Sequence, residues 1–117
     1  MGYTNNAKNG KLEQFRSRIT HVSLHSADPG TTGNNEVTGG GYSRATAPSS
    51  DWGAASGGII ELLVDKPFSG PADGTITHFG AWDDTTFLGH GTVSGGSAFN
   101  AEGNAILKAG TTANLNA

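Results

Sequence analysis

Apolar and polar residues alternate in two separate segments of the chain. Within residues 18–25, Thr20, Val22 and Leu24 would lie on one side of an extended backbone, with the residues between them on the other. Residues 75–82 (TITHFGAW) repeat this alternation. A period of two residues is typical of a strand with one face against a core. The pattern therefore predicts two half-buried strands.

Further short strands are predicted between clusters of turn-forming residues. Residues 59–65 (IIELLVD) are the densest apolar run and are predicted to form a buried strand. Residues 66–74 (KPFSGPADG) carry two prolines and are predicted to be a turn region. The other predicted strands are 42–46, 52–56, 86–93, 105–109 and 111–115. Many short strands at close spacing favour an all-β fold, an antiparallel β-sandwich of jelly-roll-like type.

The chain is predicted to begin with an arm ahead of this domain. Residues 1–17 would form a short helical or irregular arm, and residues 18–117 the β-sandwich. Asparagine followed by glycine at positions 9 and 10 is a turn signal in the middle of the arm. We therefore expect only one or two helical turns, centred on residues 11–16.

A long segment without strand character follows the first strand. Residues 26–41 (SADPGTTGNNEVTGGG) contain a Pro29-Gly30 turn signal and end in three consecutive glycines. Loops of this length in small domains are often functional or are ordered by a partner. The segment is therefore expected to be functional or to be ordered by a partner.

Two polar interactions are expected within this loop. The Asp28 carboxylate is expected to accept hydrogen bonds from backbone amides at the adjacent turn, as aspartates in turns commonly do. Arg44 is expected to pair with a carboxylate, either that of Asp28 or that of Glu36.

Composition narrows the function classes. Glycine supplies 19 of the 117 residues and charged residues only 15%, against usual values of ~7% and ~25%, which argues against a helical bundle. Cysteine is absent, so disulfides, thiolate metal sites and cysteine nucleophiles are excluded. The net charge of −3 argues against nucleic-acid binding. Without an 18-residue apolar run or a signal-peptide core, neither membrane insertion nor secretion is expected, and synthesis in a cytoplasm is the simplest interpretation.

Charge is distributed unevenly along the chain. The first 18 residues carry a net charge of +3 and the remaining 99 a net charge of −6. Such a division favours head-to-tail contact between copies or docking on an acidic partner, although a solvated basic arm has the same pattern. The basic residues concerned are Lys8, Lys11, Arg16 and Arg18.

No residue pattern predicts an enzyme. His21 and His25 would stand roughly 13 Å apart along one strand, too far to share a metal ion. Half-buried imidazoles that bond to backbone or to Ser and Thr hydroxyl groups are expected instead. Most carboxylates fall in turns, and neither a phosphate-binding glycine motif nor a nucleophile elbow is present. Catalytic residues, metals and cofactors are therefore not predicted.

The aromatic residues have two interpretations. Trp52 and Trp82 are expected to anchor either the core or a subunit interface, where tryptophan is enriched. The alternative is a sugar-stacking platform that these residues would form with Tyr3 and Tyr42, beside Asp83.

Several ordered motifs together resemble one known family. The longest is residues 22–37 (VSLHSADPGTTGNNEV), followed by 39–44 (GGGYSR). Weaker blocks follow in order at 54–58 (AASGG), 77–83 (THFGAWD), 87–89 (FLG) and 99–101 (FNA). This set is similar to small virion structural proteins of tailed bacteriophages, of the tail-fibre or minor tail protein type.

The resemblance implies a function as well as a fold. It implies a non-enzymatic virion subunit, present in multiple copies, whose partners are other virion proteins and copies of itself. A capsid decoration (head accessory) protein is the nearest alternative, and a carbohydrate-binding module for a host-surface glycan is a further one. The loop 28–41 and the N-terminal arm are expected to contact neighbouring subunits. The residues expected to serve assembly are Asp28, Pro29, Gly30, Glu36, Arg44, Lys8, Lys11, Arg16, Arg18, Trp52 and Trp82.

Overall fold

The two alternating segments form the centre of a four-stranded antiparallel sheet. They become β1 (His21–His25) and β5 (Thr75–Asp83), which lie side by side. β2 (Ala45–Thr46) and β6 (Thr86–Ala98) complete the sheet in the order β2-β1-β5-β6. This is a computed structural model, and it describes residues 5–54 and 59–114 of the chain.

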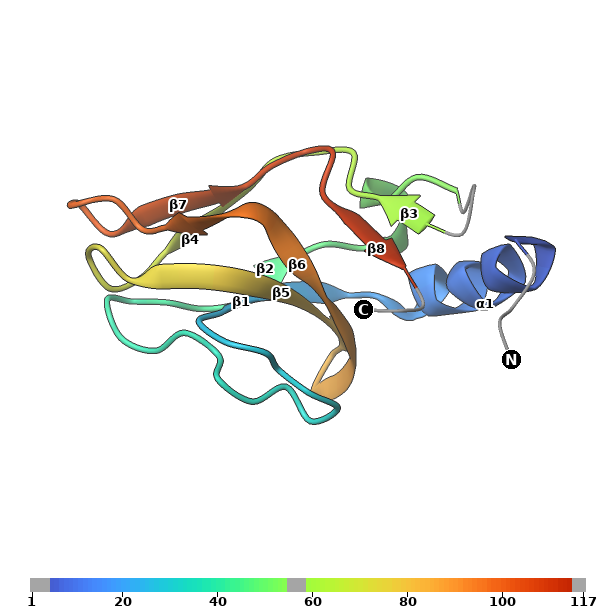
Figure 1. The fold of residues 1–117 in the computed structure, drawn as a ribbon, viewed down its shortest axis with the longest axis horizontal. Helices are drawn as coiled ribbons and strands as arrows, with labels where there is room; N and C mark the ends of the chain where they lie inside the picture. Colours follow the sequence, from blue (N-terminus) through green and yellow to red (C-terminus); the bar gives the residue numbers. More distant parts are fainter. Residues whose placement is uncertain (1–4, 55–58, 115–117) are drawn as a thin grey trace.

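Two small antiparallel sheets cover one face of the large sheet. β3 (Ile59–Glu61) pairs with β8 (Thr112–Asn114), and β4 (Lys66–Ser69) pairs with β7 (Asn104–Leu107). In Figure 1 these small sheets lie above the large one, and the long loop between β1 and β2 lies beneath it. The expected all-β, sandwich-like fold is confirmed, with the loop as an additional layer.

The hydrophobic core lies between the large sheet and the two small ones. The even-numbered β1 residues Val22 and Leu24 are opposite Ala81 and Phe79 of β5, and all four are buried. Burial of these apolar side chains supplies the main stabilisation of the fold. The rest of the buried cluster is Ile19, Val37, Ala47, Trp52, Ile60, Leu62, Phe68, Ile76, Phe99 and Leu107.

Two segments differ from the sequence-based expectation. The apolar run 59–65 is not a fully buried strand, because its strand ends at Glu61 and burial alternates along it: Ile60 and Leu62 are buried, whereas Leu63 is exposed. The proline-containing segment after it is not only a turn, because Lys66–Ser69 forms β4. Pro67 is tolerated there because β4 has a partner on one side only.

The N-terminal helix is longer than predicted. α1 (Asn5–Arg18) has 14 residues and continues through the expected turn at Gly10. Its last turn is fastened to the body, because Arg16 donates from Nη1 to the carbonyl oxygens of Ser49, in the short 3-10 helix η1 (Ser49–Asp51), and of Trp52. Tertiary contacts thus override the weak helix propensity of the segment.

Phe15 adds an apolar contact, since it packs against the core cluster. In Figure 1, α1 lies at one end of the long axis of the molecule. Within the described residues, no helix has the length and apolar character needed to cross a bilayer.

Substitution of Gly91 by alanine tests the packing of the core. A Cβ atom at this position would lie 2.6 Å from Cε1 of the buried Phe79 ring and 3.3 Å from the Thr112 carbonyl oxygen. We expect Gly91→Ala to lower the free energy of unfolding by about 1–3 kcal/mol through overpacking, as measured by urea denaturation.

Gly10→Ala is the matched control for this substitution. Nothing lies within 4 Å of a Cβ atom at Gly10, which is inside α1. Alanine there should leave the stability unchanged or raise it by up to about 1 kcal/mol. Equal effects of the two substitutions would contradict the core packing described above.

Candidate functional site: the loop beneath the large sheet

The loop of residues 26–44, here called the cover loop, returns along the edge of β1. The Ser26 amide donates to the Asn35 carbonyl oxygen, and the Val37 amide donates to the Leu24 carbonyl oxygen. Glu36 forms an isolated antiparallel bridge with His25. Unpaired backbone groups at the strand edge are satisfied in this way, which fixes the position of the loop against the sheet.

A compact turn forms the tip of the cover loop. The Gly30 amide donates to Asp28 Oδ1 over 2.8 Å, which confirms the expected bond of this aspartate to a turn amide. The Gly33 and Asn34 amides both donate to the Pro29 carbonyl oxygen. The Pro29 side chain is completely buried. The tip is therefore held by its own hydrogen bonds and by an apolar anchor.

Glycine is required where the tip meets the sheet. Gly33 has a φ of +80°, and a Cβ atom there would lie 2.8 Å from the Trp82 ring and 3.1 Å from Phe87. A larger residue would be strained in conformation and would also separate the loop from the sheet.

An ion pair closes the other end of the cover loop. Arg44 donates to Glu36 twice, from Nε to Oε2 and from Nη2 to Oε1, each over 2.9 Å. Of the two carboxylates expected as partners of Arg44, the structure selects Glu36. The Asp28 carboxylate instead lies 3.4 Å from His90 Nε2. A bidentate geometry of this kind gives strong, directional hydrogen bonds.

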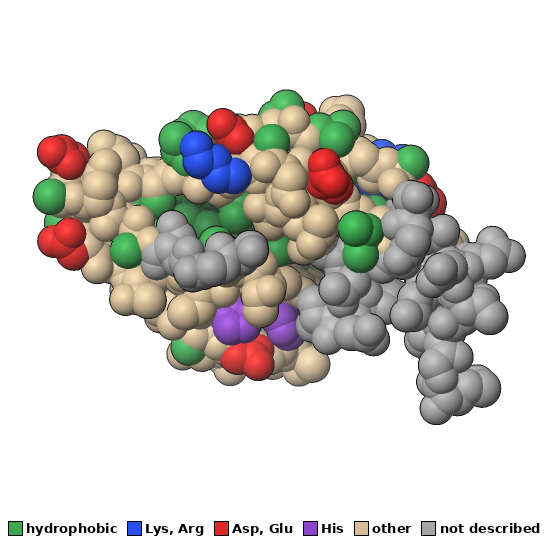
Figure 2. All heavy atoms as spheres, turned by 45° about the horizontal axis from the view of Figure 1, so that its top comes forward, with side chains coloured by type: hydrophobic (Ala, Val, Ile, Leu, Met, Phe, Trp, Pro, Cys, Tyr) green, Lys and Arg blue, Asp and Glu red, His purple; other side chains and the backbone are tan. Residues whose placement is uncertain are grey.

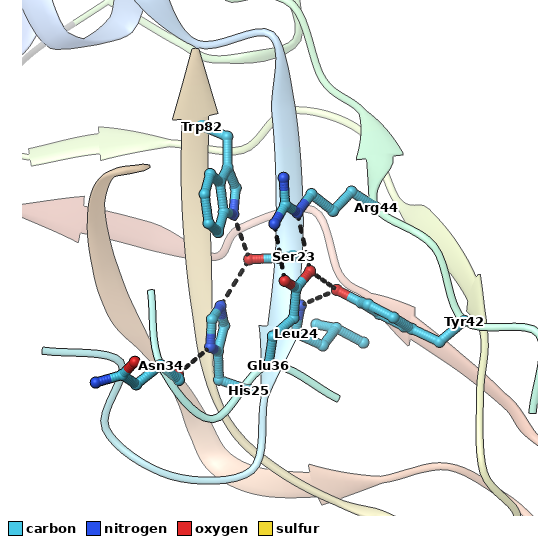
Figure 3. Close-up of polar contacts among 8 residues, drawn as sticks. All are labelled: Ser23, Leu24, His25, Asn34, Glu36, Tyr42, Arg44 and Trp82. Carbon is cyan, nitrogen blue, oxygen red and sulfur yellow. Dashed lines mark hydrogen bonds and ion pairs between the residues drawn. The ribbon is translucent and has the colours of Figure 1, made fainter. Parts of the chain in front are cut away.

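Tyr42 links this ion pair to the sheet. Its hydroxyl group donates to Glu36 Oε2 and accepts a hydrogen bond from the Leu24 backbone amide, each over 2.9 Å. The Leu24 amide lies at the edge of β1 beyond the short β2. One phenol therefore replaces a missing strand neighbour and also orients the carboxylate, as Figure 3 shows.

The contacts shift the pKa values of all three groups. Burial alone would raise the pKa of Glu36, but the hydrogen bonds from Arg44 and Tyr42 outweigh burial and hold it below its usual value. Burial raises the pKa of the Tyr42 phenol. The hydrogen bonds to Glu36 raise the pKa of Arg44. Each group is therefore held in the ionisation state that the network requires.

A second set of polar contacts lies under the loop tip. His25 Nδ1 is 2.7 Å from the Asn34 carbonyl oxygen, and Nε2 is 2.7 Å from Ser23 Oγ. The Trp82 indole donates to the same Ser23 oxygen over 2.8 Å. Because a carbonyl oxygen only accepts, Nδ1 must carry a proton, and in the neutral imidazole Nε2 then accepts from the Ser23 hydroxyl group. A neutral imidazole protonated at Nδ1 satisfies all the contacts drawn in Figure 3.

Burial agrees with this protonation state. His25 is 0% exposed, and desolvation lowers its pKa, although the Asn34 carbonyl oxygen and the Glu36 carboxylate oppose the effect. The expectation that histidines would bond to hydroxyl groups is confirmed at His25, and also at His21 and His78, whose Nδ1 atoms pair with Thr20 and Thr77. Within residues 5–54 and 59–114, no group of three or more His, Asp or Glu side chains is placed to hold a metal ion.

Both tryptophans are core residues of this chain. Trp52 is 2% and Trp82 7% exposed. Trp82 is enclosed by Phe87 on its edge and by the Arg44 guanidinium, whose carbon lies 3.4 Å from the ring centroid. The expectation of a core position is therefore confirmed for both, and the alternative of a sugar-stacking platform does not fit these two residues, because neither presents a ring face to solvent. Of the two tyrosines expected in the platform, Tyr3 lies outside the described residues, and Tyr42 is half-buried and stacks on Phe68.

The structure separates the residues predicted to serve assembly into two groups. Pro29, Trp52 and Trp82 are buried within the chain, and for the two tryptophans this is the core position that was one of their two expected alternatives. Arg16 donates hydrogen bonds to the carbonyl oxygens of Ser49 and Trp52 within the chain. The positions that stay exposed in the cover loop are 26–28, 30–32, 34, 35, 38–41 and 43.

The basic residues of the arm are only partly described. Arg18 forms an exposed ion pair with Asp83, with 3.3 Å between Nε and Oδ2. The side chains of Lys8 and Lys11 lie outside the described part of the chain.

Sequence reasoning did not find the roles of Tyr42, Ser23 and Asn34. The sequence contains one signal for them, since Ser23 and His25 are polar residues on the second face of a strand. That signal indicates a covered polar face only when the cover loop is known to lie on it.

Arg44→Ala is expected to destabilise the protein. Loss of the guanidinium leaves the partly buried Glu36 carboxylate without its main partner. We expect a decrease in the free energy of unfolding of about 1–3 kcal/mol, measured by urea denaturation. Arg18→Ala, which removes the exposed ion pair with Asp83, should cost no more than about 0.5 kcal/mol. If both substitutions had the same small effect, the ion pair would not hold the loop.

Stability is expected to fall when the solution is acidified. The pKa of His25 in the folded state lies below its unfolded value of 6.5, so its contribution is complete above that pH and is lost as the pH falls through the folded-state pKa. Protonation of Glu36, whose pKa is also lowered by folding, reduces the stability further as the pH falls below its unfolded pKa of 4.5. Urea midpoints should therefore decrease from about pH 7 to about pH 5, and His25→Gln should flatten this dependence. An unchanged slope in the variant would exclude His25 as its source.

Comparison with known proteins shows the family to which this chain belongs. A search of curated proteins gives no match. The family model described as Podophage GP4 fiber I protein gp80 matches residues 14–114, which include the large sheet, both small sheets and the whole cover loop. The match confirms the resemblance to tail-fibre proteins predicted from the sequence. The chain belongs to this family of phage fibre proteins.

Proposed function

We propose that this chain is a non-enzymatic structural subunit of a tailed-phage virion, located in the tail and assembled in multiple copies. The family match supports a role in a phage fibre. The chemistry of the site supports a structural role, because the ionisable groups of Glu36, Arg44 and His25 are engaged with one another or with the backbone. Its partners are other virion proteins and further copies of itself.

The observation that carries this proposal is the rigid anchoring of the cover loop. Its exposed positions are held by backbone hydrogen bonds, by the partly buried hydrogen bonds of Glu36, and by the buried side chains of Pro29 and Val37. A surface that is already ordered before association loses little conformational entropy when a partner binds. The cover loop is therefore suited to repeated contact with a neighbouring subunit, and its order comes from the chain itself.

Charge supports contact between copies. The basic residues are concentrated in the first 18 positions, whereas the rest of the chain is acidic. On the face drawn in Figure 2, acidic side chains are spread over the surface of the body. Attraction between the basic end of one copy and the acidic body of the next would align them head to tail.

Electron microscopy separates the tail role from its alternative. In virions carrying a tag on this chain, we expect label on the tail fibres. Label on the capsid lattice would overturn the proposal and favour the capsid decoration role. Absence of label from purified virions would contradict both roles.

Reversal of charge in the arm tests contact between copies. We expect the double substitution Lys8→Glu and Lys11→Glu to weaken self-association by about tenfold or more at low salt, measured by sedimentation equilibrium. Lys108→Glu, at an exposed position after β7, serves as the control and should have little effect. Equal self-association of the wild type and the arm variant would show that the arm is not part of the interface between copies.

A further inference from the structure

An apolar groove of about 390 Å³ lies on the exposed side of the small sheet formed by β3 and β8. Its lining consists of Gly53, Ala54, Ile59, Glu61 and Leu63. In Figure 1 this small sheet lies above the large sheet, whereas the cover loop lies beneath it. The groove is therefore separate from the cover loop.

Backbone hydrogen bonds fix the two walls of the groove relative to each other. The Gly53 amide donates to the Glu61 carbonyl oxygen over 2.7 Å, and the Leu63 amide donates to the Asp51 carbonyl oxygen over 2.8 Å. Walls that are already in place need little ordering when a partner binds.

The lining is apolar except for one carboxylate. Ile59 is 36% and Leu63 53% exposed, and they are two of the four large hydrophobic side chains that are exposed in the described part of the chain. Glu61 lies between them in sequence, and its carboxylate forms no hydrogen bond or ion pair with any described residue. Figure 2 shows hydrophobic and acidic side chains close together on this side of the molecule.

This combination fits the side chain of a lysine or an arginine. The aliphatic part of such a side chain covers apolar surface while its charged end reaches a polar partner. A cation beside Glu61 would supply the charge-assisted hydrogen bond that this carboxylate lacks within the described residues. The groove therefore favours a basic partner over an acidic one.

The chain itself offers a basic partner in α1. The first 18 residues carry a net charge of +3. Arg16 and Arg18 of this segment make contacts within their own chain, so we assign the groove to Lys8 or Lys11. Contact between the grooves of two copies is disfavoured, because it would bring two Glu61 carboxylates together.

We propose that the groove of one copy receives Lys8 or Lys11 from α1 of a second copy. The proposal rests on the contact between copies proposed above, and it adds the surface that receives the basic arm. Each copy carries both a basic helix and an acidic groove, so the same contact can repeat from one copy to the next.

An exchange of charges across the contact tests the proposal by sedimentation equilibrium of the full chain at low salt. We expect Glu61→Lys to weaken self-association by about tenfold or more, because it places a cation opposite the basic arm. Addition of Lys8→Glu and Lys11→Glu to this variant should restore association to within about threefold of the wild type, because opposite charges face each other again.

Glu102→Lys is the matched control. Glu102 is also an exposed glutamate, but it lies in the turn between β6 and β7 and does not line the groove. The substitution changes the net charge of the chain by the same amount and should leave self-association within about twofold of the wild type. Because Glu61 is exposed, Glu61→Lys should keep the wild-type melting temperature.

Failure of the groove and failure of the contact between copies give different results. If the arm variant associates weakly while Glu61→Lys associates as the wild type does, or if the combined variant does not regain association, the arm binds elsewhere and only the groove is overturned. If Glu61→Lys lowers the melting temperature but not self-association, the groove holds a cation of the same chain, and the proposal is again overturned. A wild type that stays monomeric contradicts both the groove and the contact between copies.

Discussion

The carboxylate of Glu36 is the point on which the lower layer of this protein depends. It accepts one hydrogen bond from Tyr42 and two from Arg44, and the same tyrosine hydroxyl accepts from the edge of β1. A loop with few apolar residues cannot be held by burial alone, because little surface is removed from water. Hydrogen bonds between charged groups hold the loop in place instead. The chain thereby gains a third layer without a second hydrophobic core.

The sequence predicted the elements whose pattern is local. The alternation in β1 and β5 identifies both strands, because one face of each lies on the core. β4 was not predicted, because Pro67 reads as a turn residue until the edge position of its strand is known. The length of α1 was also not predicted, since Arg16 and Phe15 stabilise it through contacts with segments far along the chain. Tertiary contacts of this kind leave no local signal.

The same distinction applies to the candidate site. The pairing of Arg44 with a carboxylate followed from opposite charges in one loop, and the turn bond of Asp28 followed from its neighbours. Ser23 and His25 lie two residues apart on β1, but the contact of Ser23 with Trp82 requires the register of β1 against β5. Because register is set by the whole sheet, no motif within a single strand specifies the contact with Trp82.

The fluorescence of the two tryptophans can report separately on the hydrophobic core and on the cover loop. Trp52 sits in the apolar core beside Phe79, and its indole nitrogen is the one fully buried side-chain polar atom without a partner among the described residues. Trp82 lies against the guanidinium of Arg44 and donates to Ser23. Because indole fluorescence responds to polarity and to neighbouring charge, the two emit from different environments. Lifting of the loop alone would alter the emission of Trp82 and leave that of Trp52 unchanged, so local opening can be told apart from global melting without an added dye.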